Sequence, residues 1–516
     1  MKLSYIYTIL CLFLVCATSA QEVKVMTYNI RLDHKGDGAD NWEYRKEDLV
    51  NYVLGEKPDF LGVQEALSNQ HLYLQEKLTA YKPIGVGRED GKTKGEFSSI
   101  FYDQSKWKCI KDSTFWLSET PALISKGWDA SYHRVCTFGL FVDQKGDTIV
   151  VSNTHLDHMG VEARKNSVIL LKEHVARYST KFPCILMGDF NFAPDDELYK
   201  SITQGLTDLR NNVKEPQEQF VGTFNGFKTD TSFTQRIDYI YYDRFHWFPY
   251  KYKSEEIKTS DGRQVSDHFP VVGILKTINA YEPKQFVSGV DTLNYRILYP
   301  PQFDKNKKYP LLLLLHGAGE RGNDNVKQLV HGGRLFLDSI EKYPAIVIAP
   351  QCPTNDYWAS VNRTENNGRL NFEFLDRPEP TKSLALVMSL VNEELSKNYI
   401  DPSRFYVTGL SMGGMGMWEL LWRMPQKIAA ALPICGGGFA KKAPLMRGIP
   451  IWTFHGTKDT TVPIYHSISM LESVQKSGGT ARINIYEGVG HNSWVNAFEE
   501  PNFLKWTFSK KKRMNN

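Results

Sequence analysis

The 516-residue chain has few cysteines, little net charge and no long apolar run after its first twenty residues. Five scattered cysteines remain beyond that segment, which excludes a disulfide framework and favours buried thiols, as for Cys184 and Cys435 in their apolar runs. The formal net charge of +4 is too small for this length to indicate a polyelectrolyte binder. The run LLLLL at 311–315 has the length of a buried strand and is too short for a membrane span. The composition, 41% hydrophobic and 23% charged, is typical of a globular protein.

The first twenty residues have the pattern of an export signal. Lys2 is followed by IYTILCLFLVCA and then by the small residues 18–20, which predicts a signal peptide, residues 1–20, cleaved before Gln21. A membrane anchor is the alternative, but the run is short of the roughly 20 apolar residues that a span needs. Cys16 follows Val15 where a lipoprotein site needs a small residue, so lipid anchoring is not expected. We therefore expect a secreted or periplasmic protein.

The length predicts more than one domain. The pattern changes near 279–290, so we expect one domain at 21–279 and a second at 280–516, the latter ending in the basic tail Lys510 to Arg513. The first domain holds about 33 Lys and Arg against 37 Asp and Glu, and the second carries a charge of about +7. The acidic balance of the first domain argues against tight binding of long duplex nucleic acid, which needs several basic contacts to phosphates.

The two halves differ in their secondary-structure pattern. The first is β-rich, with strand-like runs such as VKVMTYNI and CILMGDFN and helical spacing in ARKNSVILLKEHVARYS. The second alternates strand and helix from YPLLLLLHG to INIYEGVGH. That alternation predicts a mainly parallel sheet with helices on both faces.

In the first half, polar residues stand where apolar strands are expected to end. They are Asn29, Glu65, His155, Asp189 with Asn191, and Asp267 with His268. A lone carboxylate after the apolar run FLGVQ is unfavourable without a cation or a donor, which makes Glu65 a plausible metal ligand. Oxygen ligands without thiolates or clustered histidines favour Mg²⁺ or Mn²⁺ over zinc. Each residue taken singly could instead be a structural cap or a turn residue.

Taken together, TYNIR, GVQEA, NTHLDH, GDFN, RIDYI and SDHFP, in this order, resemble the endonuclease/exonuclease/phosphatase superfamily over about residues 22–278. The resemblance implies a four-layer α/β/β/α sandwich that hydrolyses phosphoesters with a divalent metal, Mg²⁺ or Mn²⁺. It assigns the metal to Asn29, Glu65 and Asp267. It assigns catalysis to His155, Asp189, Asn191, Asp238 and His268.

Each implied role has a physical basis. Asp189 and Asn191 alternate along one expected strand end, so their side chains should point the same way and orient the attacking water and a phosphate oxygen. His268 resembles the histidine that binds the transition-state phosphate or moves protons, and Asp238 resembles the carboxylate that orients its ring. His155 resembles a second histidine that faces the phosphate.

Other polar and aromatic residues of this half have two interpretations. Asp157 and His158 could add a metal or only line the site, and Arg134 and Arg164 could clamp phosphate or form surface ion pairs. Trp107, Trp116 and Trp128 could stack on a base or sugar, or serve as core residues.

The second half contains a serine, Ser411, in a sequence motif that is typical of a catalytic nucleophile. The strand-like RFYVTG leads into G-x-S-x-G at 409–413 and then into a helical run, the strand, turn and helix that a nucleophile elbow requires. Asp459 follows a later strand and His491 follows the next, which is the α/β-hydrolase order of Ser411, Asp459 and His491. His455, His331 and His466 are rival bases, but His491 has the better placement.

Over residues 284–508 the chain resembles the α/β-hydrolase superfamily, in particular secreted esterases and prolyl-oligopeptidase-type domains. The resemblance implies that Ser411 attacks the ester carbonyl, His491 is base and then acid, and Asp459 holds the imidazole. The sequence LHGAGERG lies at the expected oxyanion loop after His316. The backbone N–H groups assigned to the oxyanion are those of Gly317, Ala318 and Met412.

These patterns predict an exported bifunctional hydrolase, with a divalent metal in the first domain and no cofactor in the second. Small phosphoesters and carboxylic esters, glycan- or lipid-linked, are the expected substrates, and a short nucleic acid is an alternative; no oligomeric state is predicted. Trp358, Trp418 and Trp494 could line an ester pocket or pack in the core. Two other hypotheses stay open: an exported nuclease with a prolyl-oligopeptidase-type peptidase domain, or a binding protein with one silent hydrolase domain.

Overall fold

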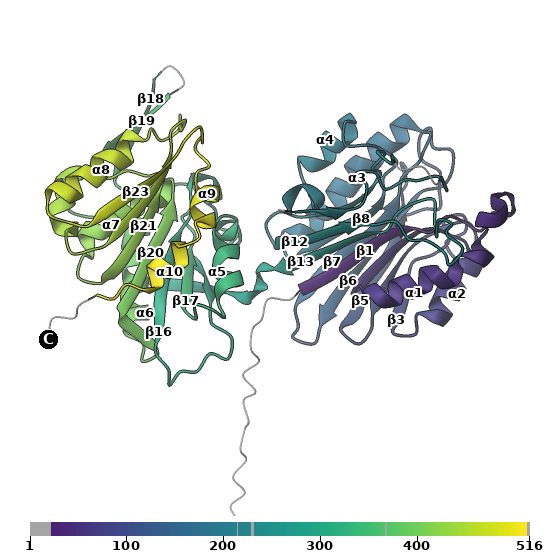
Figure 1. Ribbon diagram of the computed structural model, residues 1–516, viewed down its shortest axis with the longest axis horizontal. Helices are drawn as coiled ribbons and strands as arrows, with labels where there is room; N and C mark the ends of the chain where they lie inside the picture. Colours follow the sequence, from purple (N-terminus) through teal and green to yellow (C-terminus); the bar gives the residue numbers. More distant parts are fainter. Residues whose placement is uncertain (1–21, 214, 229–231, 367–368, 513–516) are drawn as a thin grey trace, which may run out of the picture. The chain divides into compact units, whose positions relative to one another are not determined.

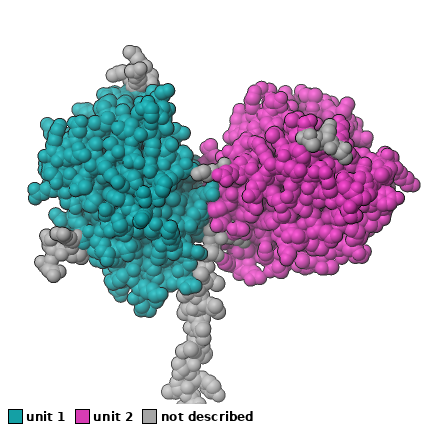
Figure 2. Space-filling view, in the orientation of Figure 1, with its two compact units in different colours: residues 1–20, 280–516 teal, residues 21–279 magenta. Residues whose placement is uncertain are grey.

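The computed structural model describes residues 22–213, 215–228, 232–366 and 369–512. It divides into two compact units, Gln21–Asn279 and Ala280–Asn516, which Figure 2 shows in different colours. The expected signal peptide and Arg513 of the tail lie outside the described residues. Within the described ranges, no helix combines the length and apolar character needed to cross a membrane.

The N-terminal unit contains two sheets (Figure 1). The first has seven strands in the order β10 (Gln217–Glu218), β12 (Trp247–Ser254), β13 (Val271–Thr277), β1 (Glu22–Asn29), β2 (Phe60–Ala66), β4 (Phe97–Asp103) and β3 (Tyr81–Ile84). The second has six, in the order β5 (Trp107–Trp116), β6 (Val135–Asp143), β7 (Thr148–His155), β8 (Cys184–Asp189), β11 (Asp238–Tyr242) and β9 (Thr207–Asp208). The helices are α1 (Lys46–Glu56), α2 (Ser68–Lys77), α3 (Val161–Ser179) and α4 (Glu197–Thr203).

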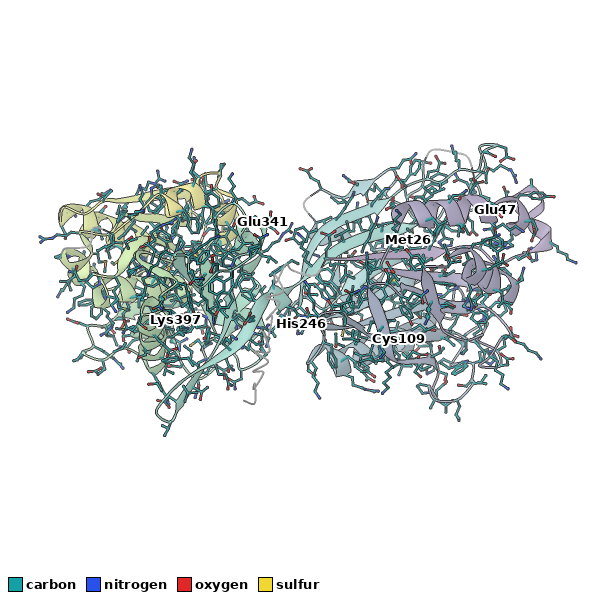
Figure 3. All side chains as sticks on the ribbon, turned by 90° about the horizontal axis from the view of Figure 1, so that it is seen from below. Met26, Glu47, Cys109, His246, Glu341 and Lys397 are labelled. Atoms are coloured by element: carbon teal, nitrogen blue, oxygen red, sulfur yellow. The ribbon has the colours of Figure 1, made fainter. Side chains whose placement is uncertain are left out.

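Side-chain alternation along the strands builds four layers in this unit. On β1, Val25 belongs to the core between the two sheets, whereas its neighbour Met26 packs in the core under α1 with Leu49. Figure 3 labels Met26 on this strand and Glu47 on α1. Helix α3 covers the outer face of the second sheet through residues such as Leu171. The predicted α/β/β/α sandwich is therefore confirmed.

The C-terminal unit is built on one eight-stranded sheet. Its strands are, in order, β14 (Tyr281–Ser288), β15 (Asp291–Leu298), β17 (Ile346–Pro350), β16 (Tyr309–Leu315), β20 (Ile400–Leu410), β21 (Ile428–Ile434), β22 (Ile451–Gly456) and β23 (Ala481–Tyr486). Strands β17, β16, β20, β21, β22 and β23 are parallel. At one edge β15 pairs antiparallel with both β17 and β14. A hairpin, β18 (Val361–Asn366) and β19 (Arg369–Phe374), stands outside the sheet.

Helices cover both faces of this sheet, as the sequence predicts. They are α5 (Gly333–Ser339), α6 (Lys382–Leu395), α7 (Met412–Arg423), α8 (Tyr465–Lys476), α9 (Trp494–Glu499) and α10 (Phe503–Phe508). Helices α6, α7 and α8 share one core with alternate strand residues such as Leu313 and Val407. On the other face Phe454 meets Phe503 of α10, with ring centroids 5.6 Å apart. The α/β-hydrolase architecture is confirmed.

Candidate active sites

The N-terminal site lies at one edge of the two facing sheets. Asn29, His155 and Asp189 are the last residues of β1, β7 and β8. Strand β11 runs antiparallel to β8, so its first residue, Asp238, lies opposite Asp189. Strand β13 likewise runs antiparallel to β1. This pairing brings the loop before β13, which contains Asp267 and His268, to the same edge. Residues far apart in the sequence meet there because starts and ends of antiparallel strands share an edge.

Glu65 occupies a strained position within β2. Its φ is +64°, and the pairing with β4 shifts register between Val63 and Ala66, as at a β-bulge. One carboxylate oxygen accepts the backbone N–H of Leu32 and the other accepts Asn29 Nδ2–H, both at 3.1 Å. The bulge therefore turns a carboxylate that belongs to an apolar strand toward the site.

Asn191 reaches the site by a turn. Strand β8 ends at Asp189, so the expectation that Asn191 continues the strand is wrong: its φ is +51°, and its N–H donates to Asp189 Oδ1 at 3.0 Å. Its Nδ2 donates to Leu156 O at 3.0 Å and lies 3.1 Å from His155 Nε2. Asp189 Oδ2 in turn accepts Asn29 Nδ2–H at 3.0 Å, so the two expected residues remain together.

His268 lies among several carboxylates. Its Nδ1 is 2.8 Å from Asp238 Oδ2, and its Nε2 is 3.7 Å from Asp189 Oδ2. Burial alone would lower the pKa of His268, but Asp238, with Asp189 and Asp267, raises it to about 10. Burial and the charge of Asp238 raise the pKa of Asp189 to about 7. His268 is thus held as an imidazolium beside a carboxyl group that titrates near neutrality.

Among the described residues of the N-terminal site, two groups could hold a metal ion. Ligand atoms of Asp189, Asp238 and His268 lie within 4.8 Å of one another, but the His268 ring is already engaged by Asp238. The other group is Glu65 with Asp267 and the amide of Asn29. Burial, and the charge of Glu65 among its neighbours, raise the pKa of Asp267 to about 6. A hard cation between the Glu65 and Asp267 carboxylates would relieve that repulsion, so these oxygen donors fit Mg²⁺ or Mn²⁺. Asn29 turns its Nδ2 toward Glu65 and its Oδ1 toward Arg31 N–H, so its amide would have to rotate to bind the same ion.

A pocket of about 590 Å³ opens over these groups. It is lined by Glu65, His155, Asp189, Asn191, Asp267 and His268, and also by Arg31, Arg88, Glu96, Tyr132 and Arg134. Three buried nitrogens at this pocket make no hydrogen bond among the described residues: His155 Nδ1, Arg88 Nε and Arg134 Nη1. The first and the third lie 3.7 and 3.9 Å from a Glu96 oxygen, beyond hydrogen-bond distance. Unpartnered buried donors at a pocket fit an anionic ligand.

Part of this lining was not predicted from the sequence. Arg88 donates to Glu96 at 2.6 Å, and that carboxylate lies 3.7 Å from His155 Nδ1. Both residues come from the loop between β3 and β4, which has no strand-end signal. Only the mixture of charges in GREDGKTKGE marks the segment.

The structure shows the surroundings of several residues in this unit that had two interpretations from the sequence. Asp157 accepts the N–H groups of Ser131, Met159 and Gly160, so it caps loops and is not free for a metal. Arg134 is buried against Asp157 and lines the pocket, whereas Arg164 donates to Asp157 O. His158 also lines the pocket. Trp107 and Trp116 are buried core residues.

In the C-terminal unit, Ser411 occupies a sharp turn between β20 and α7. Its φ and ψ are +53° and −116°, a strained conformation for a residue with a side chain. A Cβ at Gly413 would lie 2.1 Å from Leu315 O, and one at Gly409 would lie 2.8 Å from the same oxygen. The two glycines of the motif are therefore required for the close approach of backbone at the elbow.

The three predicted triad residues form a hydrogen-bonded chain. Ser411 Oγ is 2.8 Å from His491 Nε2, and His491 Nδ1 is 2.7 Å from Asp459 Oδ2. Asp459 Oδ1 accepts the N–H groups of Thr461 and Val462, both at 2.9 Å. Although burial opposes it, hydrogen bonds led by those of His455 and His491 lower the pKa of Asp459. The carboxylate is therefore held ionised against the imidazole.

The rival histidines have other partners. His455 bonds through Nδ1 to Ser467 Oγ and through Nε2 to Val462 O, at 2.8 and 2.7 Å, and its Nε2 also lies 3.2 Å from Asp459 Oδ2. His466 packs edge-on against Phe374. His331 lies 3.7 Å from a Glu320 oxygen.

The expected oxyanion loop lies against the serine. A Cβ at Gly317 would be 3.7 Å from Ser411 Cβ. Ala318 and Met412 each begin a helical segment, where the first N–H groups have no partner within the helix. The His316 ring lies 2.6 Å from Gly317 O and accepts Cys352 N–H at 2.9 Å, which holds the loop.

Two family models match the chain. The Endonuclease/Exonuclease/phosphatase family matches residues 26–268, and the Phospholipase/Carboxylesterase family matches residues 302–505. A solved mannosyl-6-phosphatase of Bacteroides thetaiotaomicron VPI-5482 is 34% identical, with 49% of this chain and 99% of that chain covered and a TM-score of 0.47.

The curated relatives named here each match less than half of this chain. Nocturnin of Rattus norvegicus is 26% identical over 44% of this chain and 58% of its own length. A bifunctional acetylxylan esterase/xylanase of Neocallimastix patriciarum is 33% identical over 36% of this chain and 23% of its own length. An uncharacterized secreted protein of Arthroderma benhamiae is 25% identical, and the match spans 25% of it. The N-terminal unit belongs to the endonuclease/exonuclease/phosphatase family and the C-terminal unit to the phospholipase/carboxylesterase family, so both units are hydrolase domains.

Proposed function

We infer that the chain is an exported bifunctional hydrolase, in which a divalent-metal-dependent phosphoesterase is joined to a serine carboxylesterase. One structural observation supports each of the two proposed activities. In the N-terminal unit, His268 with its carboxylates and three unpartnered donors surround one pocket. In the C-terminal unit, Ser411, His491 and Asp459 form a continuous hydrogen-bonded chain.

The phosphoesterase site would hold its metal on Glu65, Asn29 and Asp267. When bound, the metal supplies charge neutralisation and polarisation of a phosphoryl oxygen. Asp189, whose pKa of about 7 allows it to accept a proton near neutrality, orients and deprotonates the attacking water together with Asn191. The imidazolium of His268 donates from Nε2 to a phosphate oxygen, while Asp238 fixes its ring.

The pocket favours a small substrate. Its volume of about 590 Å³ is that of a small-molecule site. The unit carries about four more acidic than basic residues, which disfavours long duplex DNA or RNA. Small phosphomonoesters or phosphodiesters are therefore proposed ahead of a short nucleic acid. Nuclease action remains the second candidate, because a relative of Saccharomyces cerevisiae, 26% identical over 37% of this chain, is named a probable RNA exonuclease.

The esterase reaction follows from the triad geometry. His491 Nε2 takes the Ser411 proton as the hydroxyl attacks the ester carbonyl, and the same nitrogen then gives that proton to the leaving alcohol. Asp459 holds the imidazole and stabilises its charge. The N–H groups of Ala318 and Met412, with Gly317 beside them, would bind the oxyanion. The relative named as an acetylxylan esterase supports an ester substrate over a peptide.

Export is part of this proposal. The apolar run and small residues of the first twenty positions support a cleaved signal, and one relative is named as secreted. A secreted or periplasmic location is therefore proposed, without a lipid anchor.

Turnover assays with and without EDTA test the pairing of activities. The purified chain should hydrolyse both p-nitrophenyl acetate and bis-p-nitrophenyl phosphate, and EDTA should stop only the second reaction. Binding of such ligands without turnover at one unit would favour the adaptor hypothesis. Hydrolysis of a prolyl-p-nitroanilide peptide faster than any ester would favour the peptidase hypothesis.

A further inference from the structure

One side of the esterase triad is walled by three side chains that the proposed mechanism does not use. Trp494 is half-buried and meets the His491 ring edge-on, with centroids 5.4 Å apart and planes at 89°. His331 lies against the same indole at 5.0 Å. Glu320 lies 3.7 Å from His331 Nε2. We call Trp494, His331 and Glu320 the indole wall.

The wall is held rigidly beside the serine. Gly332, which follows His331, has a φ of +88°, and a Cβ there would lie 2.8 Å from the Phe498 ring of α9. Only glycine permits that approach, which brings His331 against Trp494. At the other end, a Cβ at Gly317 would lie 2.9 Å from Glu320 Oε2. The carboxylate therefore sits close to the oxyanion loop as well as to the imidazole.

The other tryptophans singled out in the sequence do not share this position. Trp358 and Trp418 are fully buried core residues, and Trp358 donates to His316 O at 3.2 Å. Glu320 and His331, by contrast, keep side-chain exposures of 15% and 31%. The indole wall is thus a partly open surface that combines an aromatic face with a carboxylate and an imidazole.

Its place indicates which part of a substrate it meets. Trp494 meets the ring of His491, which gives its proton to the leaving alcohol, so a group held on the indole wall lies beside that alcohol. Glu320 and His331 lie 3.7 Å apart, beyond hydrogen-bond distance, so an alkyl alcohol would leave part of their hydrogen-bonding capacity unused in a partly buried site. An anionic alcohol would be repelled by Glu320. A polyhydroxylated ring satisfies all three groups: its C–H face packs on the indole and its hydroxyls bond to Glu320 and His331.

We propose that the indole wall is a leaving-group subsite for a carbohydrate, so that the esterase removes acyl groups from sugar hydroxyls. This inference rests on the proposed serine esterase function. Glu320, His331 and Trp494 determine specificity and take no part in the covalent steps.

Two substrates that deliver the same acyl group isolate the leaving group. With p-nitrophenyl acetate and an O-acetylated xylo-oligosaccharide, the full chain forms the same acetyl-enzyme, so only alcohol recognition differs. The measured quantity is the ratio of kcat/KM for the carbohydrate to kcat/KM for p-nitrophenyl acetate. Trp494→Ala should lower this ratio at least tenfold and Glu320→Gln about fivefold, while Trp494→Phe should recover most of the loss.

Trp422→Ala is the matched control. Trp422 is a half-buried tryptophan on α7, eleven residues beyond Ser411 and about 16 Å along the helix. This change should leave the ratio as in the wild type. Residual turnover of p-nitrophenyl acetate shows that each variant is folded.

The outcomes separate the two proposals. An unchanged ratio in both Trp494→Ala and Glu320→Gln overturns the subsite, as does a wild-type chain that hydrolyses p-nitrophenyl acetate but no acetylated sugar. In both cases the serine esterase itself stands. A wild-type chain that hydrolyses neither ester overturns the proposed esterase function, and the subsite with it.

Discussion

The two units place the same pair of side chains in different surroundings. His268 and Asp238 lie 2.8 Å apart in the N-terminal unit, and His491 and Asp459 lie 2.7 Å apart in the C-terminal unit. The His268 side chain is 4% exposed and surrounded by further carboxylates, whereas His491 is 22% exposed and meets a neutral hydroxyl. In the proposed mechanisms, the pair therefore supplies a cation in one unit and a base in the other. What surrounds a His–Asp pair, and not the pair itself, decides its chemistry.

The largest effect is expected when the Ser411 hydroxyl is removed, which tests whether the two sites act independently. Ser411→Ala should lower esterase kcat by a factor on the order of 10⁵, because the nucleophile is lost. Phosphodiester hydrolysis by the same chain should be unchanged, as measured with bis-p-nitrophenyl phosphate. Loss of both activities would show that the two sites depend on each other.

Asp459→Asn tests the pair that acts as a base. An amide cannot hold the imidazole in the tautomer that accepts the serine proton, so esterase kcat should fall by about 10⁴-fold. Asp459 also accepts two backbone N–H groups, which an amide oxygen can still do, so the fold should persist. Steady-state kinetics with p-nitrophenyl acetate provide the measurement. A loss below tenfold would contradict the assigned role.

Metal removal should affect the activity of the N-terminal unit alone. EDTA, or Glu65→Ala, should reduce phosphoester hydrolysis by about 10³-fold, because a bound metal contributes several kcal/mol of charge stabilisation. Esterase turnover should not change. Added Mg²⁺ or Mn²⁺ should restore the EDTA-treated wild type but not the variant. Full activity in EDTA would refute metal dependence.

Asp238→Asn tests the pair that acts as a cation, and we expect a smaller effect than for Asp459→Asn. Asp189 and Asp267 still favour protonated His268, so phosphoester hydrolysis should fall by about 10- to 100-fold. The loss should be greatest at the alkaline end of the pH–rate profile. A loss that is equal at all pH values would contradict a role in holding the proton.

The smallest expected effect is on stability, where the two pairs should respond to pH in opposite directions. The raised pKa of His268 stabilises the folded N-terminal unit below pH 6.5, and that stability is lost as the pH rises to about 10. The lowered pKa of Asp459 stabilises the C-terminal unit above pH 3.8, and that contribution is lost below it. Thermal unfolding in EDTA should show both trends. Asp238→Asn should flatten only the alkaline one, and Asp459→Asn only the acidic one.

Much of both sites could be predicted from the sequence, because the chemistry follows apolar strands. Asn29, His155 and Asp189 each end a strand, and the elbow glycines around Ser411 have a steric requirement that a motif expresses. Asn191 shows the limit of such reasoning. Its left-handed turn is set by bonds to Leu156 and Asp189, which spacing alone does not encode.

Features that depend on long-range packing were not predictable. Glu96 and Arg88 enter the phosphoester pocket from a loop without periodicity, and their ion pair gives no local signal. The register shift that turns Glu65 inward depends on pairing with β4. The position of Trp494 beside His491, and not in the core like Trp418, depends on contacts between α9 and a glycine 166 residues earlier.

The backbone at Ser411 has a consequence for evolution. A serine at φ +53° costs about 1 to 3 kcal/mol that a glycine would not. Selection for heat resistance alone would therefore replace the proposed nucleophile, and Ser411→Gly should survive such a screen while losing the proposed esterase turnover. Only continued selection for catalysis keeps serine here, so directed evolution of a thermostable variant must screen for turnover and stability together.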